Sequence, residues 1–292
     1  MAGLPSSAWI AAAAAEVVKA ERPDLTLVYL PHLDYDPQRF GPSGSDLPRL
    51  VRELDDACEP LLAAAKGVGA RVWVVSEYGL VDVDQPILLN RVLRQAGYLQ
   101  ARPGPFGDIL DTFGSRAFAV VDHQVAHIYV KHPADVQPVC ELVAAQPGVD
   151  KVYAGEERTA IGLNHPRAGE LVALAQPNAW FAYPFWLECK GEPDFARTID
   201  IHRKPGYDPC ELFFDPKLVW PKGRAAWRLL QKKLGIRSLF DIVPVDPTLV
   251  RGSHGLATTD NRPILIGDGL PPAAEIAITD VRDLLLNRLQ PG

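Results

Sequence analysis

Three side chains that can bind a metal or move protons stand close together near residue 34. His32, Asp34 and Asp36 follow residues 25–30, a short apolar run that predicts a buried strand. Ligands of open α/β sheets bind just outside the carboxyl ends of strands. These side chains are therefore candidates for metal ligands or acid/base groups. The alternative is a polar loop whose aspartates hydrogen-bond their own backbone.

A second apolar run, residues 70–75, is followed directly by another carboxylate, Glu77. Between the two runs, residues 46–66 carry apolar side chains at the spacing of an amphipathic helix, which Pro60 should kink or restart. Strand, helix and strand predict a right-handed parallel βαβ unit. We expect Asp34 and Glu77 to lie at the same edge of one sheet, within reach of a shared ion.

Three motifs, in this order, resemble the alkaline phosphatase superfamily, and most closely its type I phosphodiesterase and nucleotide pyrophosphatase branch. The first is Pro-x-x-Asp-x-x-x-Gln-x-x-Gly-Pro, which begins at Pro31. The second is Ser-Glu-Tyr-Gly at residues 76–79, and the third is Ser-His-Gly at residues 253–255. Residues 167–177 are also similar to a strand of that branch.

The resemblance implies a metal-dependent hydrolase whose motif residues bind two zinc ions. It makes Asp34, Glu77 and His254 metal ligands in this chain. Gln38 and Tyr78 stand where the family carries ligand histidines, and a neutral phenol is a poor zinc ligand. The implied cofactor is a divalent metal, zinc first and manganese as the alternative.

Two further residues are candidates to replace the missing imidazoles: Asp36 in the first motif, and His202. His202 lies in a densely charged segment that also contains Arg203 and Lys204. These two cations are candidates for binding a phosphate oxygen, the arginine through a bidentate fork. The alternative is a surface ion-pair network. The substrate implied is a small phosphorylated or phosphonate-type molecule.

The catalytic nucleophile is unknown. The resemblance implies a strand with a metal-binding aspartate, then a threonine or serine at a helix start, and nothing before residue 25 matches. Ser6 and Ser7 precede an alanine-rich run and predict a helix N-cap. We therefore expect the C-terminal portion of a longer enzyme, with little or no turnover by the isolated chain.

Two functions from different classes remain open. One is hydrolysis of phosphoester-type bonds by an enzyme of the phosphodiesterase or nucleotide pyrophosphatase type. The other is a catalytically inactive relative that binds a ligand or partner, which agrees with Gln38, Tyr78 and the missing nucleophile. Bound zinc or manganese favours the first.

The predicted fold is α/β: a mostly parallel sheet with helices on both faces, an alkaline phosphatase-like core without its N-terminal part. Short strand-like runs around a helix at residues 135–145 predict an additional small α+β lobe. We expect the core in residues 1–97, the lobe in 98–180 and a return to the core in 181–292. In the lobe, His123 and His127 are interpreted as a turn and a strand residue.

Composition limits the partners. The net charge of −6 argues against nucleic acid and against an anionic membrane. No apolar stretch approaches the roughly 20 residues that span a bilayer. The four cysteines have no metal-site spacing, so we expect reduced thiols and a cytoplasmic protein. The sequence leaves the oligomeric state open.

Overall fold

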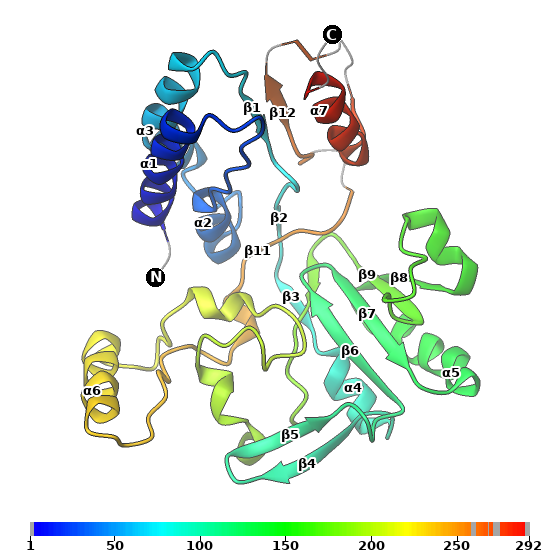
Figure 1. Cartoon of the computed structure of the whole chain (residues 1–292). Helices are drawn as coiled ribbons and strands as arrows, with labels where there is room; N and C mark the ends of the chain where they lie inside the picture. The colour runs from blue at the N-terminus through cyan, green and yellow to red at the C-terminus, as the bar shows by residue number, and fades with distance from the viewer. Residues whose placement is uncertain (1–2, 258–260, 268, 271–274, 290–292) are drawn as a thin grey trace. The chain divides into compact units, whose positions relative to one another are not determined.

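Two units make up the chain. In the computed structural model, residues 3–257, 261–267, 269–270 and 275–289 are described. The first unit comprises residues 1–36, 44–79 and 258–292, and the second comprises residues 37–43 and 80–257. Figure 1 shows the chain coloured from its N-terminus to its C-terminus.

Two long helices form the apolar centre of the first unit. Helix α1 (Leu4–Glu21) packs on α3 (Leu47–Gly67) through Ala15, Val18 and Ala64. The alanine-rich sequence of α1 keeps its side chains small at this contact. The predicted serine N-cap is wrong, because α1 already begins at Leu4 and its N-cap is Gly3.

Helix α3 is continuous. The Asp46 side chain accepts a hydrogen bond from the Arg49 backbone N–H (3.1 Å), which caps its first turn. Pro60 lies inside α3 without ending it. The helix predicted at residues 46–66 is therefore confirmed, whereas the restart expected at Pro60 is not.

The strand pairing of the first unit differs from the prediction. Strand β1 (Trp73–Val75) pairs antiparallel with β12 (Leu265–Gly267), with Val74 opposite Ile266. Residues 25–30 form no strand, and Leu27 is 79% exposed. The predicted parallel βαβ unit is wrong, because no strand among the described residues pairs with this run to satisfy its backbone groups.

The first motif forms a helix, where a loop was predicted. Helix α2 (His32–Phe40) carries Asp34 in its first turn. The backbone N–H of Asp34 donates to the Pro31 carbonyl (3.1 Å), and a carboxylate at this position also interacts favourably with the helix dipole. The first unit ends with α7 (Val281–Leu289), preceded by η6 (Ile278–Asp280).

A four-stranded antiparallel sheet forms the centre of the second unit (Figure 1). Its strands, in spatial order, are β6 (Ala117–Asp122), β7 (Val125–Val130), β9 (Leu171–Ala175) and β8 (Val149–Ala154). Buried and less buried residues alternate along β6 and β7. Helix α5 (Pro133–Ala144) contributes Val139 and Val143 to the same core. The strands and the helix predicted for the small lobe are confirmed.

Three strand pairs accompany this sheet. They are β2 (Val81–Asp82) with β11 (Gly252–Ser253), β3 (Gln85–Ile87) with β10 (Ala179–Phe181), and β4 (Gln100–Gly104) with β5 (Gly107–Asp111). Only the β3–β10 pair is parallel among the described strands. The α/β class is confirmed, but the mostly parallel sheet is wrong. The division at residues 97 and 180 stays a prediction.

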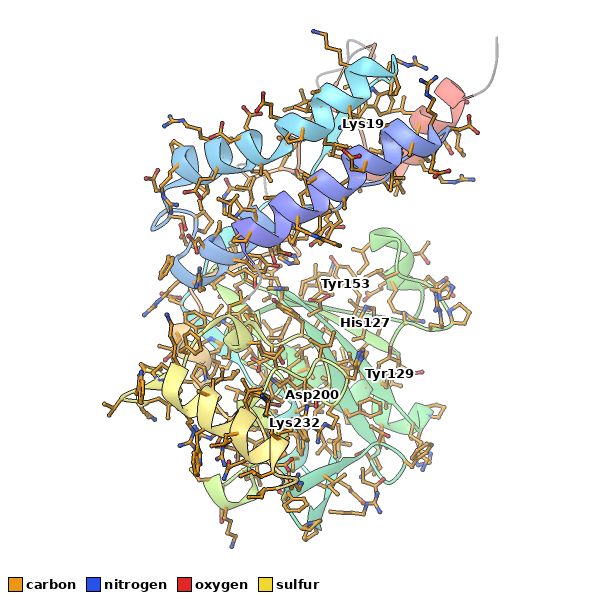
Figure 2. All side chains as sticks on the ribbon, turned by 60° about the vertical axis from the view of Figure 1, so that its left-hand side comes forward. Lys19, His127, Tyr129, Tyr153, Asp200 and Lys232 are labelled. Carbon is orange, nitrogen blue, oxygen red and sulfur yellow. The ribbon has the colours of Figure 1, made fainter. Side chains whose placement is uncertain are left out.

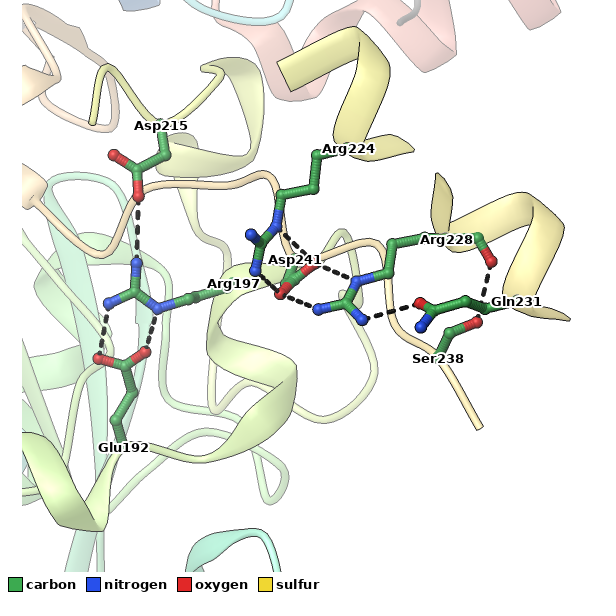
Figure 3. A network of polar contacts seen from close by, with 8 residues as sticks. All are labelled: Glu192, Arg197, Asp215, Arg224, Arg228, Gln231, Ser238 and Asp241. Carbon is green, nitrogen blue, oxygen red and sulfur yellow. Dashed lines mark hydrogen bonds and ion pairs between the residues drawn. The ribbon is translucent and has the colours of Figure 1, made fainter. Parts of the chain in front are cut away.

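The remaining helices of the second unit are short except for one. They are α4 (Leu89–Gln95), η1 (Gly155–Ile161), η2 (Cys189–Gly191), η3 (Asp194–Arg197), η4 (Pro209–Leu212), α6 (Pro221–Lys233) and η5 (Pro247–Leu249). No residue of α6 is buried. Figure 3 shows how ion pairs attach it: Arg224 and Arg228 both donate to Asp241.

Among the described helices, none combines the length and the apolar character that crossing a membrane requires.

Candidate functional site

Two carboxylates and three phenols gather in the first unit. We call Asp34, Glu77, Tyr29, Tyr35 and Tyr78 the carboxylate–tyrosine cluster. Its central contact joins two motifs, because the Tyr78 hydroxyl donates a hydrogen bond of 2.9 Å to Oδ1 of Asp34. Helix α2 supplies Asp34, and the segment that follows β1 supplies Glu77 and Tyr78.

The electrostatics of the cluster keep Tyr78 neutral. Burial raises the pKa of the Tyr78 phenol, and the Asp34 carboxylate raises it further through its charge and its hydrogen bond. Burial, followed by the charges of Asp34 and Glu77, also raises the pKa of Tyr29. Both carboxylates therefore act on the same two phenols, and Tyr78 remains a hydrogen-bond donor at neutral pH.

The segment that carries Glu77 and Tyr78 is fixed at both ends. The backbone N–H of Ser76 donates to the Ile264 carbonyl (3.0 Å), and the Ile264 N–H donates to the Ser76 hydroxyl (2.7 Å). At Gly79, a Cβ atom would lie 1.6 Å from the carbonyl oxygen of Asn261. Only glycine fits this approach, which explains the last residue of the Ser-Glu-Tyr-Gly motif.

The other two polar residues of the first motif have separate partners. His32 Nε2 lies 3.1 Å from a Glu53 carboxylate oxygen on α3. Asp36 lies 3.7 Å from the Arg49 guanidinium, which also pairs with Glu53 at 2.5 Å. These contacts attach α2 to α3. They give His32 and Asp36 ion-pair partners within the first unit.

The donor set does not fit two zinc ions with imidazole ligands. Within the described residues, no three His, Cys, Asp or Glu side chains gather closely enough to hold a metal. The Tyr78 hydroxyl donates its proton in a hydrogen bond to Asp34. Gln38 is buried, and no described residue donates a hydrogen bond to its Oε1 atom. Asp34 and Glu77 offer carboxylate oxygens, the ligand type that Mg²⁺ and Mn²⁺ prefer.

A pair of histidines forms a separate cluster in the second unit. The rings of His123 and His254 lie 3.8 Å apart between centroids, with an interplanar angle of 34°. His123 Nδ1 and the Ser253 hydroxyl are joined by a hydrogen bond of 3.0 Å. Burial lowers the pKa of His254 to about 4, and burial with the neighbouring His254 lowers that of His123. Both imidazoles are therefore neutral at pH 7.

The other histidine of this hairpin has a backbone partner. His127 lies on β7, two residues before Tyr129 (Figure 2). Its Nδ1 atom accepts a hydrogen bond from the Gly169 N–H (3.3 Å). The interpretation of His123 and His127 as a turn and a strand residue is confirmed. The stacking of His123 on His254 was not predicted.

In the charged segment before η4, which contains residues 202–204, a buried lysine makes the main contacts. Lys204 is fully buried and donates to three oxygens, those of Asp208 (2.7 Å), Glu211 (2.6 Å) and the Thr198 backbone (3.0 Å). These three bonds use all its donors. Arg203 pairs with Asp200 (2.6 Å) at the surface.

His202 is exposed in the same turn, next to Arg203. The exposed position leaves both side chains accessible to a ligand from solvent. Lys204 differs from them because the protein interior encloses its ammonium group.

Comparison with known proteins identifies the family. Residues 4–208, more than half of the chain, match the family described as type I phosphodiesterase / nucleotide pyrophosphatase. The chain belongs to this family. Comparison of this phosphodiesterase-family chain with curated proteins gives no match.

Solved structures similar to this family member have low sequence identity. Phosphonoacetate hydrolase from Sinorhizobium meliloti 1021, in complex with phosphonoacetate, is 18% identical, with a TM-score of 0.44; the match covers 62% of this chain and 43% of that chain. An inactive murine ectonucleotide pyrophosphatase/phosphodiesterase 5 in complex with AMP is 19% identical, with a TM-score of 0.43, over 62% of this chain and 44% of that chain. The human enzyme is 17% identical, with a TM-score of 0.44, over 82% and 60%. The chain thus spans less than half the length of the first two.

Proposed function

We propose that this chain takes part in metal-dependent hydrolysis of phosphoester-type bonds in small phosphorylated or phosphonate-type molecules. The observation that carries the proposal is the family match over residues 4–208, which contain both carboxylates of the carboxylate–tyrosine cluster. The cluster supports it chemically, because one phenol donor links the two motif segments that bear Asp34 and Glu77.

Each residue of the cluster has a role in this proposal. Asp34 and Glu77 bind a divalent cation through their carboxylate oxygens, with manganese favoured over zinc because no imidazole belongs to the set. Tyr78 orients Asp34 through its hydrogen bond. When bound, such a cation polarises a phosphoryl oxygen. Asp36 is less suited to the role, since Arg49 already lies beside it.

His254 and the surface arginine have roles in the second unit. His254 is neutral at pH 7, so its imidazole can accept a proton or act as a ligand. We propose Arg203 and the exposed His202 as groups that contact an anionic substrate. Lys204 receives a structural role here, because its three donors are occupied.

A catalytically inactive, ligand-binding relative is the second candidate. Gln38 and Tyr78 favour it, because neither supplies the imidazole that a zinc ligand at its position would need. In this candidate the cluster binds a small phosphorylated ligand without turnover.

Release of p-nitrophenol from bis(p-nitrophenyl) phosphate, with and without Mn²⁺, tests the proposal. We expect little turnover by the isolated chain, and any turnover should require Mn²⁺ and be lost in Asp34→Asn. Asp36→Asn, on the same helix, is the matched control and should keep the activity. No turnover with either Mn²⁺ or Zn²⁺, together with AMP binding measured by calorimetry, would establish the second candidate instead.

A further inference from the structure

We propose that His123 is a positioning residue that fixes the orientation of the His254 imidazole. The inference rests on the role of His254 in the proposed function and assigns it a supporting structure. Three observations carry it: the stack of two rings, the hydrogen bond that holds the stack, and the backbone that brings both to one place. All lie within the second unit.

The stack limits the motion of His254. With centroids 3.8 Å apart, the two rings are in van der Waals contact, tilted by 34° to each other. His123 is 3% exposed, so its own ring cannot turn away into solvent. The Tyr207 ring also stacks on His123, with centroids 4.9 Å apart and an interplanar angle of 29°. His123 therefore contacts two rings, of which only His254 belongs to the last motif.

The hydrogen bonds at this point fix the register of the stack. Ser253, fully buried, bonds His123 Nδ1 through its hydroxyl. The backbone N–H of Gln124 donates to the His254 carbonyl (2.9 Å). The turn at residues 123–124 thus holds residues 253–254 through one side chain and one backbone group, although the two segments are far apart in the sequence. The hydroxyl can donate to Nδ1 or accept from it, so this bond fixes the position of the His123 ring rather than its tautomer.

The backbone of His123 adopts a positive φ angle, which is less favourable for most residues than a negative one. Its φ angle is +55°, in the left-handed region that few non-glycine residues adopt. Asparagine or glycine would satisfy the turn between β6 and β7 more easily. Histidine is itself among the side chains enriched at such angles, so the turn tolerates it, and its role is inferred from its ring contacts.

The charged segment before η4 completes the arrangement. Gly206 and Tyr207 lie along β6, where the Tyr207 N–H donates to the Val121 carbonyl (2.9 Å). At Gly206, φ is +124° and a Cβ atom would lie 1.9 Å from the same carbonyl oxygen. The buried ammonium group of Lys204 anchors this segment through its bonds to the carboxylates of Asp208 and Glu211. The segment therefore keeps the Tyr207 ring against His123.

Nuclear magnetic resonance of the ¹⁵N-histidine-labelled full chain tests the proposal. His254→Gln identifies the His254 signals. In the wild type we expect ring-proton shifts of His254 that are displaced by the His123 ring. His123→Asn tolerates the positive φ but removes the ring, so the His254 shifts should move towards those of an unstacked imidazole. His123→Phe keeps a ring without the nitrogen and should restore most of the displacement.

The matched control is His127→Asn, a histidine of the same hairpin, and it should leave the His254 signals unchanged. Unchanged His254 signals in His123→Asn would overturn the inference. Equal changes in the His127 variant would also overturn it, because a general loosening of the sheet would then be the cause. Ser253→Ala removes the hydrogen bond to His123 Nδ1, and the displacement of the His254 shifts should persist.

A separate arm distinguishes this inference from the proposed function. If Mn²⁺-dependent turnover exists, His123→Asn should lower kcat about 10–100-fold, the usual cost of losing a residue that orients a ligand, and His123→Phe should recover part of it. If the wild type shows no turnover, the proposed function fails. The resonance measurement then still decides whether His123 positions His254.

Discussion

The hydroxyl of Tyr78 donates a hydrogen bond of 2.9 Å to Oδ1 of Asp34. This contact joins the first two motifs of the sequence through a phenol in the place where the family carries an imidazole. Tyr78 is neutral, so it contributes a donor and no charge to the cluster. In the proposed function the ligands of the cation are carboxylate oxygens, which would favour manganese or magnesium over zinc.

Replacing Tyr78 by histidine should change the preferred metal. Tyr78→His supplies a nitrogen ligand beside Asp34 and Glu77, so we expect zinc affinity to rise by at least about tenfold, or ~1.4 kcal/mol. Calorimetric titration with Zn²⁺ measures the change. Tyr35→His is the control, because it adds an imidazole to the same cluster without replacing the donor to Asp34. An equal gain in both variants would contradict the assigned geometry.

The ion pairs of α6 predict a pH-dependent stability. Burial by itself raises the pKa of Asp241, but hydrogen bonds from Arg228 and Arg224 outweigh it and hold the pKa well below its ordinary value of 3.8. The native carboxylate therefore binds a proton less readily than the unfolded one. Its stabilisation is present above pH 3.8 and is lost as the pH falls through that value towards the native pKa.

Removing one arginine should reduce this stabilisation. In Arg228→Gln we expect the free energy of unfolding at pH 7 to fall by about 1–2 kcal/mol, and the loss should shrink below pH 3.8. Urea denaturation at a series of pH values measures both. Arg282→Gln, which removes an exposed pair with Asp283, should have little effect at any pH. A pH-independent loss in Arg228→Gln would show that packing is responsible.

Gly79→Ala should destabilise the first unit. A Cβ atom at this position would lie 1.6 Å from the Asn261 carbonyl oxygen, so the backbone must move. Overpacking of this kind typically costs about 1–3 kcal/mol. Gly67→Ala, at the end of α3 with no atom within 4 Å of the added Cβ, is the matched control and should be neutral. Thermal denaturation compares the two, and equal stability would refute the close approach.

Replacing Lys204 should lower the stability of the protein rather than its affinity for substrate. Lys204→Met leaves the Asp208 and Glu211 carboxylates buried without their cation, and breaking such a buried pair typically costs about 3–5 kcal/mol. Lys232→Met on the exposed face of α6 is the control (Figure 2). A stable Lys204→Met protein with weakened binding of AMP would return Lys204 to the substrate-binding role.

Local periodicity predicted the parts of the fold that depend on neighbouring residues. The hairpin of β6 and β7 alternates buried and less buried side chains, and α3 has the apolar spacing of an amphipathic helix, so the sequence was sufficient for both. The strand expected at residues 25–30 fails because an apolar run specifies no partner strand. Strand β1 instead pairs with β12, nearly two hundred residues later, in the antiparallel direction.

For the candidate site, too, the sequence predicted some features and the tertiary structure was needed for others. Motif order brought attention to Asp34, Glu77 and His254, but the phenol donor of Tyr78 could be recognised only when its 2.9 Å contact with Asp34 was known. His123 was placed correctly in its turn, yet its stacking on His254 depends on tertiary packing between distant segments. Sequence spacing carries no information about such a contact.

Titration of the full chain with Mn²⁺ in a calorimeter tests the central claim, that Asp34 and Glu77 together bind a divalent cation, most directly. The account predicts one Mn²⁺ per chain, with binding lost in Asp34→Asn and in Glu77→Gln but retained in Asp36→Asn, whose carboxylate lies beside Arg49. Failure of the folded wild-type chain to bind Mn²⁺, or an equal loss in Asp36→Asn, would contradict it.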